Sequence, residues 1–150
     1  MKLISYFEQK DQKPYYEQIR KAGWSGAASL AKLLESGTFF EKLGDDSSLL
    51  ILEDEGRIAA FCTLAEHDDV PDTDLGPWIG YVYTDPDYRG QHLAGRLMET
   101  AERRAAGEGK EAIYISTGHE GLYEKYGYDL FCHLPNKHGV SSRIYRKKLG

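Results

Sequence analysis

The segment RIAAFCTLAE, residues 57–66, carries apolar side chains at consecutive positions instead of alternate ones. Read as a strand, it has two apolar faces: Ile58, Ala60, Cys62 and Leu64 against Ala59, Phe61 and Ala65. A strand that is apolar on both sides has to be covered on both sides. The segment PWIGYVYT, residues 77–84, has the same character. These two segments predict a central sheet with helices on each face.

The hydrophobic patterns of the remaining segments predict further strands and helices, so the chain is expected to be mixed α/β. Strands are expected at residues 1–7, 48–56, 111–117, 128–134 and 142–149, and helices at 14–23, 27–37, 91–106 and 118–127. A hairpin is expected around Asp54-Glu55-Gly56. The basic residues of the last strand suggest a charged strand at the sheet edge. No repeat or linker divides the chain, which predicts one domain over residues 1–150.

Composition narrows the function classes. The net charge of -5 argues against a general nucleic-acid binder. No apolar run is long enough to cross a membrane, and the N-terminus does not read as a signal peptide. Cys62 and Cys132 have no CxxC spacing, so no metal site is expected, and two reduced thiols fit a cytoplasmic protein.

The helix expected at residues 91–106 begins without a residue that would cap it. It follows Tyr88-Arg89-Gly90, which contains no Ser, Thr, Asp or Asn. Its first amides therefore need another partner, and a bound phosphate would satisfy them. Gly90 would let the backbone approach such an anion, and Arg89 would add charge. The alternative is an exposed helix end whose amides are solvated by water.

The stretch VYTDPDYRGQHLAGRLMETAE resembles the acetyl-CoA-binding motif of the GNAT N-acetyltransferases, Arg/Gln-x-x-Gly-x-Gly/Ala. Arg89 matches its first position and Ala94 its last, whereas His92 stands where the family usually has glycine. The segment LYEKYGY, residues 122–128, is similar to the family's second motif. The order of the expected elements also agrees with the family.

The resemblance implies an α+β fold with a mixed, mostly antiparallel sheet of six to seven strands and helices on both faces. Two parallel strands, residues 78–84 and 112–117, would splay into a V-shaped cleft for the cosubstrate acetyl-CoA, with no metal. The backbone of Tyr81, Val82, Tyr83 and Thr84 would pair with pantetheine. The diphosphate would be held by Arg89, Gly90, Gln91, His92, Leu93 and Ala94. His119 would also contact the cosubstrate.

The resemblance implies direct transfer of acetyl to an amine, and Tyr123 matches the family's general-acid tyrosine. Thr117 and Glu120 have capping-box spacing, so Tyr123 is expected about one and a half turns into a short helix. Its alternative role is core packing. Glu66 is expected to be the base, because it follows the two-sided strand and could face the cleft.

An acidic loop follows Glu66, containing Asp68, Asp69, Asp72 and Asp74. It could attract a cationic substrate, or it could simply be solvated. The family's acceptor pocket is built by the first two helices, so Trp24 and Tyr15 are expected to contact the substrate, through apolar or cation–π contacts.

The expected acceptor is a small-molecule amine, with a protein amine as the second choice. A non-catalytic acyl-CoA-binding or sensing module is the alternative class. A homodimer formed through the C-terminal strands is also implied as possible.

Overall fold

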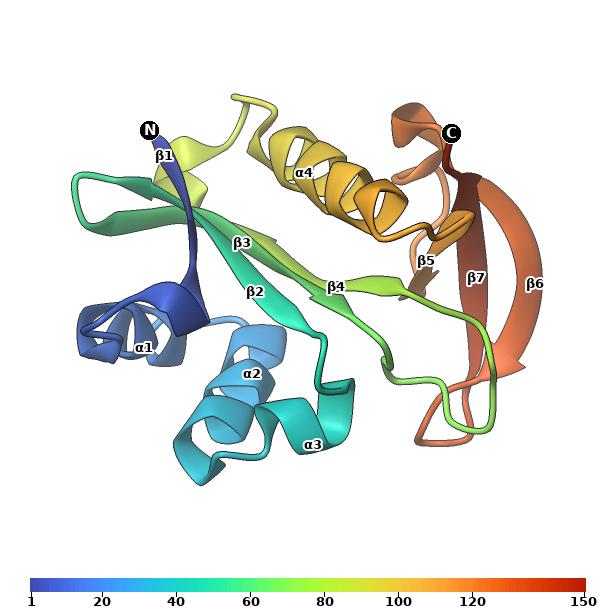
Figure 1. Ribbon diagram of the computed structural model, residues 1–150, viewed down its shortest axis with the longest axis horizontal. Coiled ribbons are helices and arrows are strands. Elements are labelled where there is room, and N and C mark those ends of the chain that lie inside the picture. The colour runs from blue at the N-terminus through green and yellow to red at the C-terminus, as the bar shows by residue number, and fades with distance from the viewer.

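The computed structural model describes residues 1–150, and its centre is one seven-stranded sheet (Figure 1). The strands are β1 (Lys2–Ser5), β2 (Ser48–Asp54), β3 (Arg57–Ala65), β4 (Trp78–Thr84), β5 (Ala112–Thr117), β6 (Asp129–Pro135) and β7 (Ser141–Lys148). Their order is β1-β2-β3-β4-β5-β7-β6, and only β4 and β5 are parallel neighbours. The predicted mixed, mostly antiparallel sheet is confirmed.

Helices cover both faces of this sheet. They are α1 (Lys13–Arg20), α2 (Ser25–Ser36), α3 (Phe39–Leu43) and α4 (Leu93–Gly107), with short 3-10 turns η1 (Tyr6–Glu8), η2 (Pro86–Tyr88) and η3 (Glu124–Tyr126). Figure 1 shows α1, α2 and α3 on one face and α4 alone on the other. α3 was not predicted from the sequence, because its five residues are too few to display a helical period.

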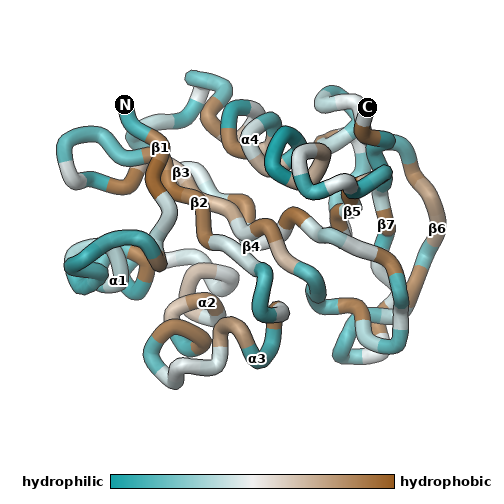
Figure 2. The backbone as a smooth tube through the Cα atoms, in the orientation of Figure 1, coloured by the Kyte–Doolittle hydropathy of each residue, from teal (hydrophilic) through white to brown (hydrophobic).

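Two buried clusters flank the sheet, as the two-sided strand requires. The cluster on the α4 side has 17 buried residues and the cluster on the α1–α3 side has 13. β3 contributes to both, and eight of its nine residues are buried. Figure 2 shows hydrophobic colour along β2 and β3, between helices in which hydrophobic and hydrophilic residues alternate. Burial on both faces therefore fixes β3 at the centre of the fold.

The assignment of Ile58 to one face of β3 is wrong. The register jumps from Leu52 opposite Ala60 to Glu53 opposite Ile58, which leaves Ala59 as the extra residue of a β-bulge. Because side chains alternate along a strand, one extra residue moves those before it to the other face. Ile58 consequently packs on the α1–α3 side and Ala59 on the α4 side.

Two expectations for the C-terminal third are also wrong. The helix expected at residues 118–127 shrinks to η3, because Gly121 takes a positive φ of 84° and the Thr117 hydroxyl accepts from the nearby His119 amide instead of starting a helix. The charged last strand, β7, is not an edge strand. It lies between β5 and β6, and the sheet edges are β1 and β6.

Candidate functional site

The sheet opens between its two parallel strands. β4 pairs with β3 from Trp78 to Thr84, whereas its only partner pair on the other side joins Trp78 to Tyr114 of β5. Beyond that point the β5 side of β4 has no strand partner. Unpaired backbone groups in the middle of a sheet can bind an added extended chain. The predicted splayed parallel strands are therefore present.

A β-bulge in β4 lies at the start of this opening. Three steps along β4, from Gly80 to Tyr83, oppose two steps along β3, from Thr63 to Phe61. Within the bulge Tyr81 adopts a positive φ of 49°. Bulges bend a strand and increase its local twist. This bulge accounts physically for the divergence of β4 from β5.

The N-terminus of α4 faces no capping side chain. Its first bond runs from the Arg96 amide to the His92 carbonyl, 3.1 Å, so the amides before Arg96 lie outside the helical ladder. Gly90 has a φ of 83° and His92 a φ of 57°, both in the left-handed region. Arg89 is exposed and forms no ion pair in the protein. The start of α4 thus leaves amides and an arginine without protein partners, as the expected anion cradle requires.

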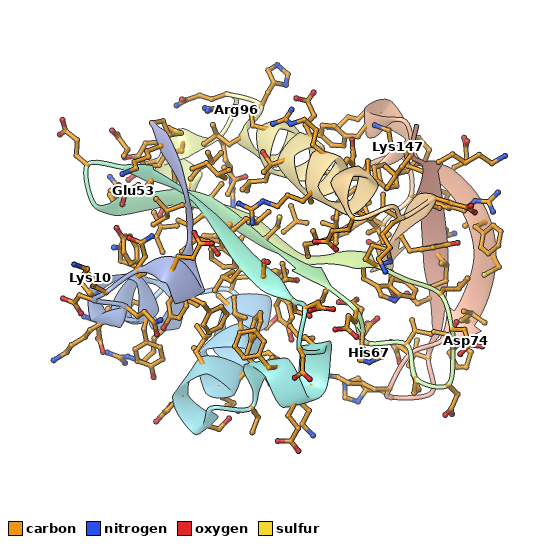
Figure 3. The ribbon with its side chains drawn as sticks, viewed as in Figure 1. Lys10, Glu53, His67, Asp74, Arg96 and Lys147 are labelled. Atoms are coloured by element: carbon orange, nitrogen blue, oxygen red, sulfur yellow. The ribbon has the colours of Figure 1, made fainter.

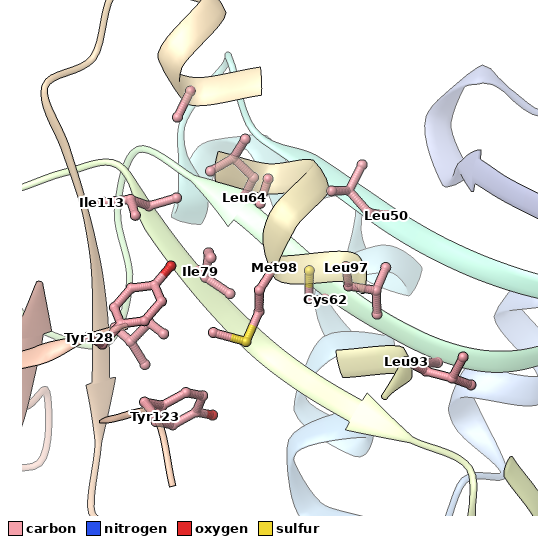
Figure 4. Packing of buried hydrophobic residues seen from close by; sticks show 14 of the residues in the cluster. Leu50, Cys62, Leu64, Ile79, Leu93, Leu97, Met98, Ile113, Tyr123 and Tyr128 are labelled. Carbon is pink, nitrogen blue, oxygen red and sulfur yellow. The ribbon is translucent and has the colours of Figure 1, made fainter. Parts of the chain in front are cut away.

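Tyr123 lies at the edge of the α4-side cluster. Its side chain is 9% exposed, and its hydroxyl makes no hydrogen bond to another protein group. Figure 4 shows that hydroxyl turned away from Tyr128. Burial raises the pKa of Tyr123 to about 12, with smaller contributions from Cys62, Tyr126 and Asp68. Tyr123 therefore stays protonated at neutral pH and keeps a free donor.

The Glu66 carboxylate is held on the β2 side of β3. Its Oε1 accepts from the Asp46 amide at 2.8 Å, and its side chain leans over Gly44. Since β2 and β4 flank β3 on opposite sides, this contact directs the carboxylate away from the opening. The structure does not bring Glu66 together with Tyr123.

Asp68, instead of Glu66, lies over β4 at the first residue of its bulge. A Cβ built on Gly80 would meet Asp68 Oδ1 at 2.5 Å and the Thr63 hydroxyl at 3.1 Å, so both groups lie over the first residue of the bulge. Burial, then the Asp69 carboxylate, raises the pKa of Asp68 to about 7, against an opposing effect of Lys137. The available signal was Thr63, the one polar residue inside an otherwise apolar run.

The two expected acceptor residues lie apart. The Trp24 ring stacks on Tyr83 of β4, with centroids 5.6 Å apart and planes 12° apart. Tyr15 instead donates to Glu53 of β2, and Figure 3 shows Glu53 at the opposite end of the sheet from His67. A cavity of about 340 Å³ lies between α1, β3 and β4, with Tyr83 in its wall. Of the two expected acceptor residues, therefore, only Trp24 lies beside a residue of β4 that lines this cavity.

Three further features bear on the function. His119 is exposed just after β5, where its amide donates to the Thr117 hydroxyl at 3.0 Å. The fold brings together no three His, Cys, Asp or Glu side chains suited to hold a metal ion. No helix combines the length and apolar character needed to cross a membrane.

Comparison with known proteins agrees with this geometry. The family model for the acetyltransferase (GNAT) family matches residues 6–128. No curated protein matches the sequence. The structure is similar to the GNAT family N-acetyltransferase YhbS from Escherichia coli in complex with CoA, with 23% identity, 99% of this chain and 81% of that chain covered, and a TM-score of 0.68.

Two other solved structures have comparable similarity. The aminoglycoside 6'-N-acetyltransferase from Enterococcus faecium is 16% identical, with 99% and 97% of the two chains covered and a TM-score of 0.68. The ribosomal-protein-S18-alanine N-acetyltransferase from Escherichia coli is 19% identical, with 99% and 94% covered and a TM-score of 0.66. At these identities the likeness concerns the fold.

Proposed function

Because the chain belongs to the acetyltransferase (GNAT) family, we propose that it transfers the acetyl group of acetyl-CoA to a primary amine of a small molecule. The observation that carries this proposal is the opening between β4 and β5, which begins beside the single pair of Trp78 and Tyr114. Residues 1–150 act in this proposal as one catalytic domain.

The residues around the opening fit an extended thioester with a diphosphate. The unpaired side of β4, from Tyr81 to Thr84, offers backbone groups to the pantetheine arm. The uncapped amides at the start of α4 offer donors to the diphosphate, and the free guanidinium of Arg89 adds positive charge. His119 follows β5, the other wall of the opening.

The chemistry needs a neutral amine and a stabilised thiolate. An alkyl ammonium has a pKa of about 10.4, so deprotonation at pH 7 costs about 4–5 kcal/mol. The amine nitrogen then bonds to the acetyl carbon, the carbon–sulfur bond breaks, and the sulfur leaves as a thiolate. With a pKa of about 12, Tyr123 is a weaker acid than a thiol of about 8.5, so its role is hydrogen-bond donation to the developing thiolate.

Two features support an amine acceptor on the α1–α3 side. Trp24 stacks on Tyr83 beside the cavity between α1 and β4, and aromatic faces bind cations as well as apolar groups. The similar structures include enzymes for an aminoglycoside and for the alanine of a ribosomal protein. The open cavity of about 340 Å³ suits a small molecule better than a folded protein surface.

The proposal is tested first at the cosubstrate site. Arg89→Ala should weaken acetyl-CoA binding by about 10-fold or more, because a hydrogen bond to a charged group contributes roughly 1.5–3 kcal/mol. Calorimetry measures the affinity, and Arg103→Ala, an exposed arginine later in α4, is the matched control. No acetyl-CoA binding by the wild type at millimolar concentration would refute the proposal.

The second test concerns turnover. Tyr123→Phe should lower the rate of thiol release with a good amine substrate by about 10- to 100-fold, at unchanged acetyl-CoA affinity. Because the raised pKa keeps Tyr123 protonated, the wild-type rate should show no alkaline loss from this group below about pH 11. Tyr126→Phe is the control, since Tyr126 packs on Gly95. Binding without thiol release over a broad amine panel would instead indicate a sensing module.

A further inference from the structure

We propose that Thr63, Asp68 and Asp69 form the binding site for the ammonium group of the acceptor, and that Asp68 takes its proton. This inference rests on the proposed transferase function, and it defines the acceptor class as amines that arrive positively charged. It replaces Glu66 with Asp68 as the residue that meets the amine.

The first support is a polar group that the fold leaves without a partner. Thr63 is completely buried in β3, and its hydroxyl makes no hydrogen bond. Asp69 Oδ1 is also buried and unpartnered. Buried polar atoms are nearly always satisfied in folded proteins, and those that are not call for a ligand or an ordered water. An ammonium group has three donors, which matches a hydroxyl and two carboxylates.

The second support is the shared position of these groups. Asp68 Oδ1 and Thr63 Oγ1 both lie within about 3.1 Å of one point above Gly80, where only a glycine leaves room for them. Gly80 is also the residue from which the β4 bulge begins. This shared position therefore joins the acidic loop to the strand that lines the opening, instead of leaving the loop solvated.

The face of the sheet is also consistent with this role. Phe61 and Ala65, which alternate with Thr63 along β3, pack on the α1–α3 side. Tyr81, whose pKa is raised first by burial and in part by Asp68 and Asp69, lies 3.5 Å from Ser29 of α2 through its hydroxyl. The site therefore lies on the side of the expected acceptor helices, while Tyr123 packs in the cluster on the α4 side.

The loop is anchored so that its carboxylates stay in place. The Lys137 amide donates to the Asp69 carbonyl at 2.6 Å, which ties the acidic loop to the connection between β6 and β7. Figure 3 shows His67 and Asp74, which bracket the two carboxylates in sequence, along the same lower side of the molecule. The Asp69 carboxylate raises the pKa of Asp68, whereas a hydrogen bond from the Asp69 backbone and the charge of Lys137 lower it.

The proton balance of the step is complete. The Asp68 carboxylate accepts one proton from the ammonium, and the resulting amine attacks the thioester carbon. The carbon–sulfur bond breaks, and the thiolate receives the second proton released from nitrogen as the amide forms. Asp68 returns its proton to solvent. The net products are the acetylated amine, the free thiol and one proton.

The experiment compares Asp68→Asn with Asp74→Asn, a matched loss of charge at an exposed position of the same loop. With 1,4-diaminobutane as probe, Asp68→Asn should lower kcat/KM for thiol release about 100-fold, at an acetyl-CoA affinity within twofold of wild type. Asp74→Asn should change kcat/KM less than threefold. Equal effects of the two substitutions would overturn the inference, as would a much larger effect of Glu66→Gln.

The pH dependence of kcat/KM distinguishes a base from a residue that only supports the structure. A base must be deprotonated to act, so wild-type kcat/KM should rise as the pH passes through about 7, the raised pKa of Asp68. Asp68→Asn should abolish this rise, whereas His67→Gln, a control for the neighbouring imidazole, should keep it. An unchanged profile in Asp68→Asn would overturn the role as base.

Thr63→Val is a second variant that tests the same site if Asp68→Asn does not fold. Removing an unpartnered buried hydroxyl should leave the Tm equal or higher, yet lower kcat/KM for the diamine about 10-fold. Saturation-transfer NMR of 1,4-diaminobutane reports binding without turnover. If the wild type shows a saturation-transfer signal that Asp68→Asn loses, the ammonium site is supported. If the wild type then releases no thiol, the ammonium site stands and the transferase function is refuted. No signal in the wild type would refute the site itself.

Discussion

His92 holds a backbone conformation at the start of α4 that L-residues rarely adopt. Its φ of 57° places it in the left-handed region, where glycine has no penalty. Histidine, asparagine and aspartate are enriched there among the other residues, which explains how the chain departs from the family's glycine without losing the turn. The departure therefore changes the side chain beside the anion cradle and leaves the backbone path intact.

His92→Gly should raise the stability of the protein. A non-glycine residue in the left-handed region destabilises the folded state by about 1–2 kcal/mol, and glycine removes this strain. Part of the gain is offset because glycine also increases the conformational entropy of the unfolded chain. The net gain should be about 1 kcal/mol, seen as an increase in Tm of about 2–4 °C in thermal unfolding. Gln91→Gly, at an exposed neighbour without positive φ, should not raise the Tm. An equal rise in both variants would contradict this account.

Among these residues, the uncapped start of α4 was easier to predict from residue types than the positions of the carboxylates. Arg89 and Gly90 are recognisable because a helix start without a cap is visible in the sequence itself. Glu66 and Asp68 are not distinguishable in this way, because both follow the same strand. The deciding contacts, to Asp46 and over Gly80, come from distant parts of the chain.

Among the elements, α1 is attached to the sheet through Tyr15. The Tyr15 hydroxyl donates to Glu53 of β2, and this hydrogen bond raises the pKa of Tyr15 to about 12. Because the folded-state pKa is the higher one, the contribution of this contact to stability is complete below about pH 10 and is lost as the pH rises through 12. Its position assigns Tyr15 to packing of α1 instead of acceptor binding.

Tyr15→Phe should therefore lower the free energy of unfolding by about 1 kcal/mol at neutral pH, because it removes a partly exposed hydrogen bond to a carboxylate. Urea denaturation measures the change, and the difference from wild type should shrink above pH 11. kcat/KM for an amine substrate should stay within twofold. A large loss of amine turnover at unchanged stability would restore Tyr15 to the acceptor pocket.

Element types were predictable wherever periodicity was long. α2, α4 and the β2–β3 hairpin lie within a few residues of their expected bounds. The misses share one cause, which is that short segments are decided by tertiary contacts. η3 forms in place of a helix next to Gly121, and the bulge at Ala59 exchanges the faces of Ile58 and its neighbour.

In the whole molecule, the strand order leaves β6 as one edge of the sheet. Leu130 and Phe131 of β6 are 48% and 41% exposed, and the Arg146 guanidinium lies 4.2 Å from the Phe131 ring centroid. Large apolar side chains on a sheet edge favour pairing with another strand. We propose this edge as the interface of the homodimer that the family resemblance implies as possible.

We expect the protein to elute as a dimer in size-exclusion chromatography with light scattering, and Phe131→Glu to elute as a monomer. Phe40→Glu adds the same charge at an exposed phenylalanine of α3 and should leave the dimer intact. Thiol release per chain should persist in the monomer, because the opening between β4 and β5 belongs to one chain. A monomeric wild type at 100 μM or so would contradict this expectation.

The single pair of Trp78 and Tyr114 has a mechanical consequence. On one side of it lie β1 to β4, and on the other lie β5, β7 and β6, so the two parts of the sheet share one strand pair and are otherwise held together by α4 and the buried cluster on its side. A small buried cluster formed by this pair with Val70 and Ile144 also joins the two parts. An extended molecule lying along β4 would bridge the two parts of the sheet. Its binding would therefore also stabilise their arrangement, and tighter binding would mean a more rigid sheet.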